Sequence, residues 1–144
     1  MMKKFLVAIV AVSTMVLGFT SCEKKADVNV YPIAGKTYQA TEDDGTVKVT
    51  FHTNFRVTFA AKPVGDQTET KNNNFVWEMS LEKVDGVRKI YIYFADGTVN
   101  TTTGEIVSGK KAYEGTYDGE VIILYPTYPV VDQSSALTYL PLLQ

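Results

Sequence analysis

The only histidine of the chain, His52, is the first residue whose chemistry could indicate catalysis. A histidine beside a serine can act as the general base of acyl transfer, because its imidazole takes the proton of the attacking hydroxyl. The sequence has no Gly-x-Ser-x-Gly turn to present such a serine, and no spacing identifies a partner for the ring. We therefore expect His52 to be a solvated residue at a strand end, next to a turn.

The acidic residues offer two further kinds of chemistry. Glu78 and Glu82 lie four residues apart on one face of an expected strand, and a glycosidase needs two carboxyl groups facing one sugar. Ordinary solvent-facing acids show the same spacing, and this is the interpretation we favour. Glu42-Asp43-Asp44 could attract Ca²⁺, but it lacks the alternating acids and the closing glutamate of a calcium loop, so we expect a hairpin turn. The sequence thus predicts no enzyme, no metal site and no cofactor.

The single cysteine, Cys22, cannot close an intramolecular disulfide or build a thiolate zinc site alone. It follows a cationic start, Met1-Met2-Lys3-Lys4, and an apolar stretch from Phe5 to Phe19. This stretch is shorter than the roughly 20 residues that a membrane-spanning helix needs. The pattern predicts a cleaved signal peptide over residues 1–21.

The residues before the cysteine define the type of signal. Leu17-Gly18-Phe19-Thr20-Ser21-Cys22 resembles the lipobox of bacterial lipoproteins, with Phe19 and Thr20 in place of the usual leucine and small residue. The resemblance implies cleavage before Cys22, acylation of Cys22 and a lipid bilayer as partner. It also implies the outer membrane, because Glu23 stands where an aspartate would retain the protein at the inner membrane. The motif does not distinguish the periplasmic leaflet from the surface leaflet.

The rest of the chain predicts one domain. Residues 22–30 read as an acylated cysteine with a polar tether, and residues 31–144 read as a single folded unit. The 144 residues carry 14 basic and 16 acidic side chains, for a net charge of -2, and no basic run is interleaved with aromatic residues. This charge pattern argues against a nucleic-acid partner.

Alternation of apolar and polar residues recurs after Cys22, for example over residues 47–52 and 55–59, and no window carries a long helical period. Four Asp-Gly pairs mark turns between strand-like segments. We predict an all-β fold, an antiparallel up-and-down meander of about eight to nine strands closed into a barrel, with an open β-sandwich as the alternative. The expected strands lie near residues 35–40, 46–52, 54–61, 74–83, 87–95, 98–101, 110–117, 120–125 and 136–142.

Two stretches, 61–74 and 126–135, have the composition of long loops. Loops of this length in a small domain often carry function. They are therefore the candidate contact surface for another protein or a glycan.

Aromatic residues are frequent in the expected strands. An eight-strand barrel has an interior wide enough for its own side chains or for one small ligand. Core packing is one interpretation of these residues, and an aromatic-lined ligand site is the other. The candidate ligand-binding residues are Phe75, Trp77, Met79, Tyr91, Tyr93, Tyr113 and Tyr117, although alternation places some of them on opposite faces.

The order of these motifs is similar to that of small lipocalin-like lipoproteins. A lipobox and a polar tether precede Ile33-Ala34-Gly35-Lys36-Thr37-Tyr38, in which Gly35 and Tyr38 resemble the glycine and aromatic residue of a first lipocalin strand. Segments 113–117 and 137–140 resemble the closing strands of such barrels. The resemblance implies a lipocalin-like barrel that holds a small apolar molecule at its mouth.

Two functions follow as hypotheses. The first is a membrane-anchored, non-enzymatic lipocalin-like lipoprotein of the cell envelope that binds a small apolar or amphipathic ligand. The alternative is an envelope interaction module, such as an accessory subunit, adhesin or inhibitor, that contacts a protein or glycan through its long loops.

Overall fold

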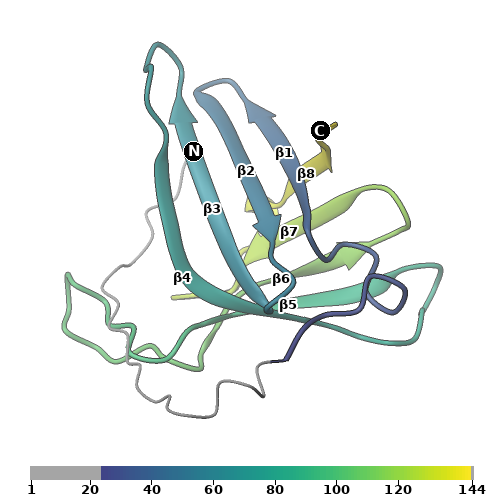
Figure 1. Cartoon of the computed structure of the whole chain (residues 1–144). Helices are drawn as coiled ribbons and strands as arrows, with labels where there is room; N and C mark the ends of the chain where they lie inside the picture. The colour runs from purple at the N-terminus through teal and green to yellow at the C-terminus, as the bar shows by residue number, and fades with distance from the viewer. Residues whose placement is uncertain (1–23, 144) are drawn as a thin grey trace.

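A computed structural model describes residues 24–143, and these residues form a closed barrel of antiparallel strands in chain order (Figure 1). Each strand pairs with its neighbours in sequence, and the last strand pairs with the first. The predicted all-β meander barrel is confirmed, and the alternative of an open sandwich is wrong. The strands are β1 (Lys36–Glu42), β2 (Gly45–Phe51), β3 (Arg56–Pro63), β4 (Thr70–Met79), β5 (Arg88–Phe94), β6 (Lys111–Tyr117), β7 (Ile122–Pro126) and β8 (Leu137–Pro141).

The alternation in the sequence determines which side chains fill the barrel. In β2, Val47, Val49 and Phe51 are buried, whereas Lys48 and Thr50 between them are half-exposed on the outer face. The same period recurs in β5, where Ile90, Ile92 and Phe94 are buried. Burial of one face fixes the register of each strand, because a slip by one residue would move the whole apolar set into water.

The meander gives the barrel two different ends. Connections 52–55, 80–87 and 118–121 lie at one end, together with the residues that precede β1. Connections 43–44, 64–69, 95–110 and 127–136 lie at the other. We call the first the plugged end and the second the mouth end, for reasons given below.

The structure corrects the predicted strand over residues 98–101. This segment forms only one isolated bridge, between Val99 and Ile106, inside the connection 95–110. Its hydrogen bonds are local, since the Asn100 N–H donates to the Glu105 carbonyl and the Val107 N–H to the Thr98 carbonyl. Residues 98–101 pair with other residues of connection 95–110 and not with a barrel strand. This connection, the longest between strands in the described chain, was therefore not predicted from the sequence.

The predicted loop 61–74 is also shorter than expected. β3 extends to Pro63 and β4 begins at Thr70, which leaves only residues 64–69 as a connection. The polar segment Thr70 to Asn74 belongs to β4, where Asn72 Oδ1 accepts a hydrogen bond from the Asn74 N–H at an irregularity in the pairing with β3. The polar composition of this segment indicated a loop. Its backbone N–H and C=O groups are instead paired with those of β3, so it forms a strand.

The second predicted loop, 126–135, is confirmed with a shift of one residue. Residues 127–136 connect β7 to β8 and contain one short 3₁₀ turn, η2 (Gln133–Ser135). The side chain of Asp132 orders this turn, because its carboxylate accepts hydrogen bonds from the hydroxyls of Ser134 and Ser135. The Tyr128–Pro129 peptide bond in the same connection is cis.

Candidate functional site

The plugged end is closed by the residues that precede β1. The Ala26 N–H donates to the Thr53 carbonyl (2.6 Å), and Ile33 is fully buried. Tyr31 packs its ring edge-on against Trp77 and Phe55, with ring centroids 5.6 and 5.8 Å apart. We call residues 26–35 the plug. Residues 26–30, which the sequence placed in the tether, thus contribute to the closure of the barrel.

Aromatic rings fill the barrel above the plug. Trp77 contacts Phe51 edge-on at 5.7 Å, and its indole N–H donates to the His52 carbonyl (3.0 Å). Further towards the mouth, Phe59 and Phe75 pack at 5.3 Å. Edge-to-face contacts between rings add to the free energy gained from burial. This part of the interior is occupied by the protein's own side chains.

The seven predicted ligand-binding residues are divided among three places. Phe75 and Tyr113 lie inside the barrel towards the mouth end. Trp77, Met79 and Tyr117 are buried towards the plugged end. Tyr91 and Tyr93 alternate with the buried Ile90 and Ile92 and lie on the outer face. The structure therefore does not bring the seven together in one site.

The outer-face tyrosines belong to a charged surface. Lys111 lies 5.3 Å above the ring of Tyr91, and its ammonium group donates to the Glu114 carboxylate at 2.8 Å. Lys89 approaches the same carboxylate at 3.2 Å. Hydrogen bonds from Lys111 lower the pKa of Glu114, whose ionised form is thereby favoured. This arrangement is typical of a solvated barrel surface.

Apolar side chains that pack on the core stay partly exposed at both ends of the barrel. They are Tyr31 and Phe55 at the plugged end, and Tyr113, Tyr128 and Leu137 at the mouth end. The ring of Tyr113 lies 4.8 Å from that of Phe59, and Tyr128 packs edge-on against Phe94 at 5.3 Å. Burial raises the pKa of Tyr113 well above its ordinary value, so its hydroxyl is neutral. Tyr128 and Leu137 were not predicted, although alternation with the buried Tyr139 places Leu137 on the inner face.

Two connections at the mouth end are joined by polar contacts. The Tyr128 hydroxyl donates to Glu105 Oε1 (2.8 Å) and accepts from Asn100 Nδ2 (3.1 Å). Lys110 donates to the other oxygen of Glu105 at 2.7 Å, and this contact is the main cause of the lowered pKa of Glu105. These bonds hold connections 95–110 and 127–136 together beside the mouth.

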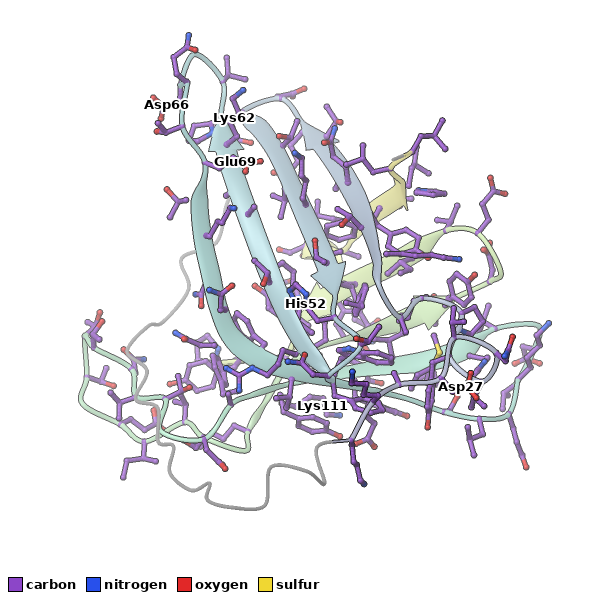
Figure 2. The ribbon with its side chains drawn as sticks, in the orientation of Figure 1. Asp27, His52, Lys62, Asp66, Glu69 and Lys111 are labelled. Carbon is purple, nitrogen blue, oxygen red and sulfur yellow. The ribbon has the colours of Figure 1, made fainter. Side chains whose placement is uncertain are left out.

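A separate polar groove lies on the outer face near the tip of the β3–β4 hairpin. Its volume is about 430 Å³, and two of its lining residues, Lys48 and Glu69, form an ion pair of 3.2 Å. Figure 2 shows Lys62, Asp66 and Glu69 at this tip, away from His52. The groove could not be predicted from the sequence, since residues far apart in the chain form it. Its lining is Gln39, Thr46, Lys48, Lys62, Gln67 and Glu69.

His52 directly follows β2 and is half-buried. The Thr58 hydroxyl donates to Asn73 Oδ1 (2.7 Å) and lies 2.8 Å from His52 Nε2. Because a hydroxyl has one hydrogen, Nε2 must be the donor to Thr58. The ring is therefore bonded within the outer face and not solvated as the sequence predicted.

The protonation of His52 provides a first testable prediction. Burial lowers the pKa of His52 from its ordinary 6.5, and the neighbouring charge of Arg56 lowers it further. The unfolded chain then binds more protons than the folded one, so His52 reduces stability as the pH falls below about 6.5. We expect an NMR titration of the ring to give a midpoint below 6.5, and nitrogen shifts of the neutral ring to show the proton on Nε2. Arg56→Gln should raise the midpoint, and a midpoint above 6.5 in the unmodified protein would contradict the argument.

The acidic residues do not form a facing pair. Glu78 is exposed on the outer face of β4, whereas Glu82 lies beyond the end of that strand in connection 80–87. Glu42 ends β1 beside the turn at Asp43-Asp44, as the hairpin interpretation predicted. Within residues 24–143, no group of three or more His, Cys, Asp or Glu side chains is arranged to hold a metal ion.

Comparison with known proteins gives no relative. No family model matches the chain, and no curated protein or solved structure is significantly similar to it. The architecture itself is an eight-stranded antiparallel barrel, consistent with a lipocalin-like barrel. Within the described residues no helix is long and apolar enough to cross a membrane. The predicted signal peptide and Cys22 lie outside the described residues.

Proposed function

We propose that this protein is a non-enzymatic, lipid-anchored barrel of the bacterial cell envelope that binds a small apolar or amphipathic molecule at the mouth end. The observation that carries the proposal is the group of apolar side chains at the mouth end. Tyr113, Tyr128 and Leu137 pack on the core there and stay partly exposed, as Tyr31 and Phe55 do at the plugged end, where the plug inserts Ile33 and Ala34 into the core. Small-molecule sites usually combine apolar and aromatic side chains with a few polar groups.

The chemistry of the mouth favours an amphipathic ligand. Leu137 and the rings of Tyr113 and Tyr128 offer apolar contact. The Tyr128 hydroxyl, with Glu105 and Asn100 beside it, is a polar group at the same end of the barrel. A ligand with an apolar body and one hydroxyl or carbonyl group would match both.

The anchor in this proposal is Cys22. It rests on the lipobox-like sequence, and it places the protein at the envelope with the outer membrane favoured. Two or three acyl chains would hold the barrel at the bilayer, because each buried methylene contributes about 0.8 kcal/mol.

Native mass spectrometry of the mature protein from its host's envelope tests the ligand. We expect a small-molecule adduct at fixed stoichiometry in the unmodified protein. Leu137→Trp should abolish the adduct, because an inward indole fills the mouth. Leu140→Trp on the same strand is the matched control, since Leu140 is 54% exposed on the outer face. An adduct that persists equally in both variants, or no adduct in the unmodified protein, would contradict the proposal.

The polar groove on the outer face favours a second candidate, an interaction module for a glycan. Two amides, a hydroxyl, two ammonium groups and a carboxylate line the groove, and such groups suit a hydroxyl-rich partner. The same experiment separates the candidates. A sugar-sized adduct that survives Leu137→Trp but is lost in Lys62→Ala would favour the groove.

A further inference from the structure

The plugged end lies close to the proposed anchor. The first backbone contact of the plug is the hydrogen bond from the Ala26 N–H to the Thr53 carbonyl. Only residues 23–25 separate Cys22 from Ala26. A fully extended chain advances about 3.5 Å per residue, so Cys22 lies within about 14 Å of Ala26. An acylated Cys22 would thus hold the plugged end directly at the bilayer surface.

Both ends expose apolar side chains, with Val64, Ile106, Val130 and Val131 at the mouth end, so the closeness of Cys22 is what selects the plugged end. Leu81 is 66% exposed and Val84 is 63% exposed, both in connection 80–87. On the plug, Val28 is 49% exposed and Val30 is 40% exposed. We call Val28, Val30, Leu81 and Val84 the footprint.

Arg88 joins the two segments that carry the footprint. Its Nη1 donates to the Val30 carbonyl (2.8 Å), and its Nε donates to the Ser80 carbonyl (2.7 Å). Its guanidinium also lies 5.8 Å from the ring centre of Tyr31. The plug and connection 80–87 therefore lie side by side (Figure 1) and present their apolar side chains from one end of the barrel.

Charge at this end does not favour an anionic surface. Exposed bases and acids occur in similar numbers on and directly beside the plug and on the connections at this end. The bases are Lys24, Lys25, Lys36 and Lys83, and the acids are Asp27, Glu82, Asp85, Asp118 and Glu120. Contact with a bilayer would therefore depend on the acyl chains and the apolar side chains, and not on anionic lipid.

We infer that the acylated protein rests with its plugged end on the bilayer surface and inserts the footprint at the boundary between headgroups and acyl chains. The inference rests on the acylation of Cys22 in the proposed function. It goes beyond that function because it orients the barrel: the mouth end faces away from the membrane. Figure 2 shows Asp27 of the plug on the opposite side of the molecule from Lys62, Asp66 and Glu69, which mark the tip of the β3–β4 hairpin. A ligand or glycan would then be taken from the aqueous side and not from the anchoring leaflet.

Site-directed spin labelling of the mature acylated protein tests the orientation. Cys22 is the only cysteine, so acylation leaves a cysteine introduced elsewhere as the sole reactive thiol. Labels at Leu81→Cys and Val130→Cys form a matched pair, because these residues are 66% and 68% exposed at opposite ends. In phosphatidylcholine vesicles, we expect the label at position 81 to be relaxed several-fold more by oxygen than by a water-soluble nickel complex. The label at position 130 should show the reverse.

Flotation of the same samples with vesicles separates the two ways of failing. Protein that floats with both labels accessible to the nickel complex would overturn the orientation and leave the anchor intact. Protein that floats with only the label at position 130 in lipid would overturn it as well. Protein that does not float would overturn the acylation, and the inference with it. An oxygen effect at position 81 that requires anionic lipid would contradict the apolar footprint.

Discussion

Gly115→Ala should destabilise the barrel by about 3 kcal/mol or more, as expected for a backbone clash in a packed core. Gly115 lies in β6 opposite Leu124 of β7, and the two backbones approach closely there. A Cβ on residue 115 would overlap the Ile123 carbonyl oxygen and lie 2.8 Å from its carbon. Backbone atoms cannot move aside by a change of rotamer, so the β6–β7 ladder itself must shift. Urea denaturation followed by circular dichroism measures the loss.

Gly65→Ala is the control for this prediction. Gly65 has a φ of +88° in connection 64–69, and a Cβ there would meet no atom within 4 Å. Its substitution should cost only the left-handed backbone penalty of about 1 kcal/mol. Equal losses of stability in the two variants would show that the close approach of β6 and β7 is not what requires glycine at position 115.

The sequence predicted the strands well because their signal is local. Alternation in β2 and in β5 identifies the buried face without knowledge of any partner strand. The Asp85-Gly86 pair shows that a turn can also be predicted from local sequence alone. Both residues have positive φ, at 57° and 84°, between the bridged Val84 and Val87, as expected for the tight hairpin that this pair favours.

Predictions failed where pairing depends on distant residues. Thr70 to Asn74 look like a loop by composition but form a ladder with β3. Residues 98–101 look like a strand but pair inside their own connection. Neither outcome follows from local propensity, because whether a segment forms a strand depends on the strand that it can pair with.

The candidate site was predictable only in part for the same reason. Alternation places Tyr91 and Tyr93 on one face of β5, but it does not say whether that face is the inner one. The burial of Ile90 and Ile92 decides the matter once the barrel closes. Tyr128 lies in a connection and has no period, so its packing against Phe94 had no signal in the sequence.

Trp77→Ala should destabilise the protein by about 4 kcal/mol, because it removes a buried aromatic ring and leaves a cavity. Trp77 is 2% exposed, and its ring contacts both Tyr31 of the plug and Phe55 of the adjoining turn. Its indole N–H donates a hydrogen bond to the His52 carbonyl, and its backbone N–H donates one to the Phe55 carbonyl. The side chain thus ties the plug, the β2–β3 turn and β4 together.

Trp77→Phe separates the ring from its hydrogen bond. This variant keeps an aromatic ring against the plug and loses the indole N–H, so we expect a loss of about 1 to 2 kcal/mol. Hydrogen exchange supplies a local measurement, since the Ala26 amide is bonded to the Thr53 carbonyl at the start of the plug. Trp77→Ala should release the Ala26 amide to exchange before the amides of β5 and β6, whereas Trp77→Phe should keep it protected. If both variants lose the same stability and the same protection, the hydrogen bond and not the ring holds the plug in place.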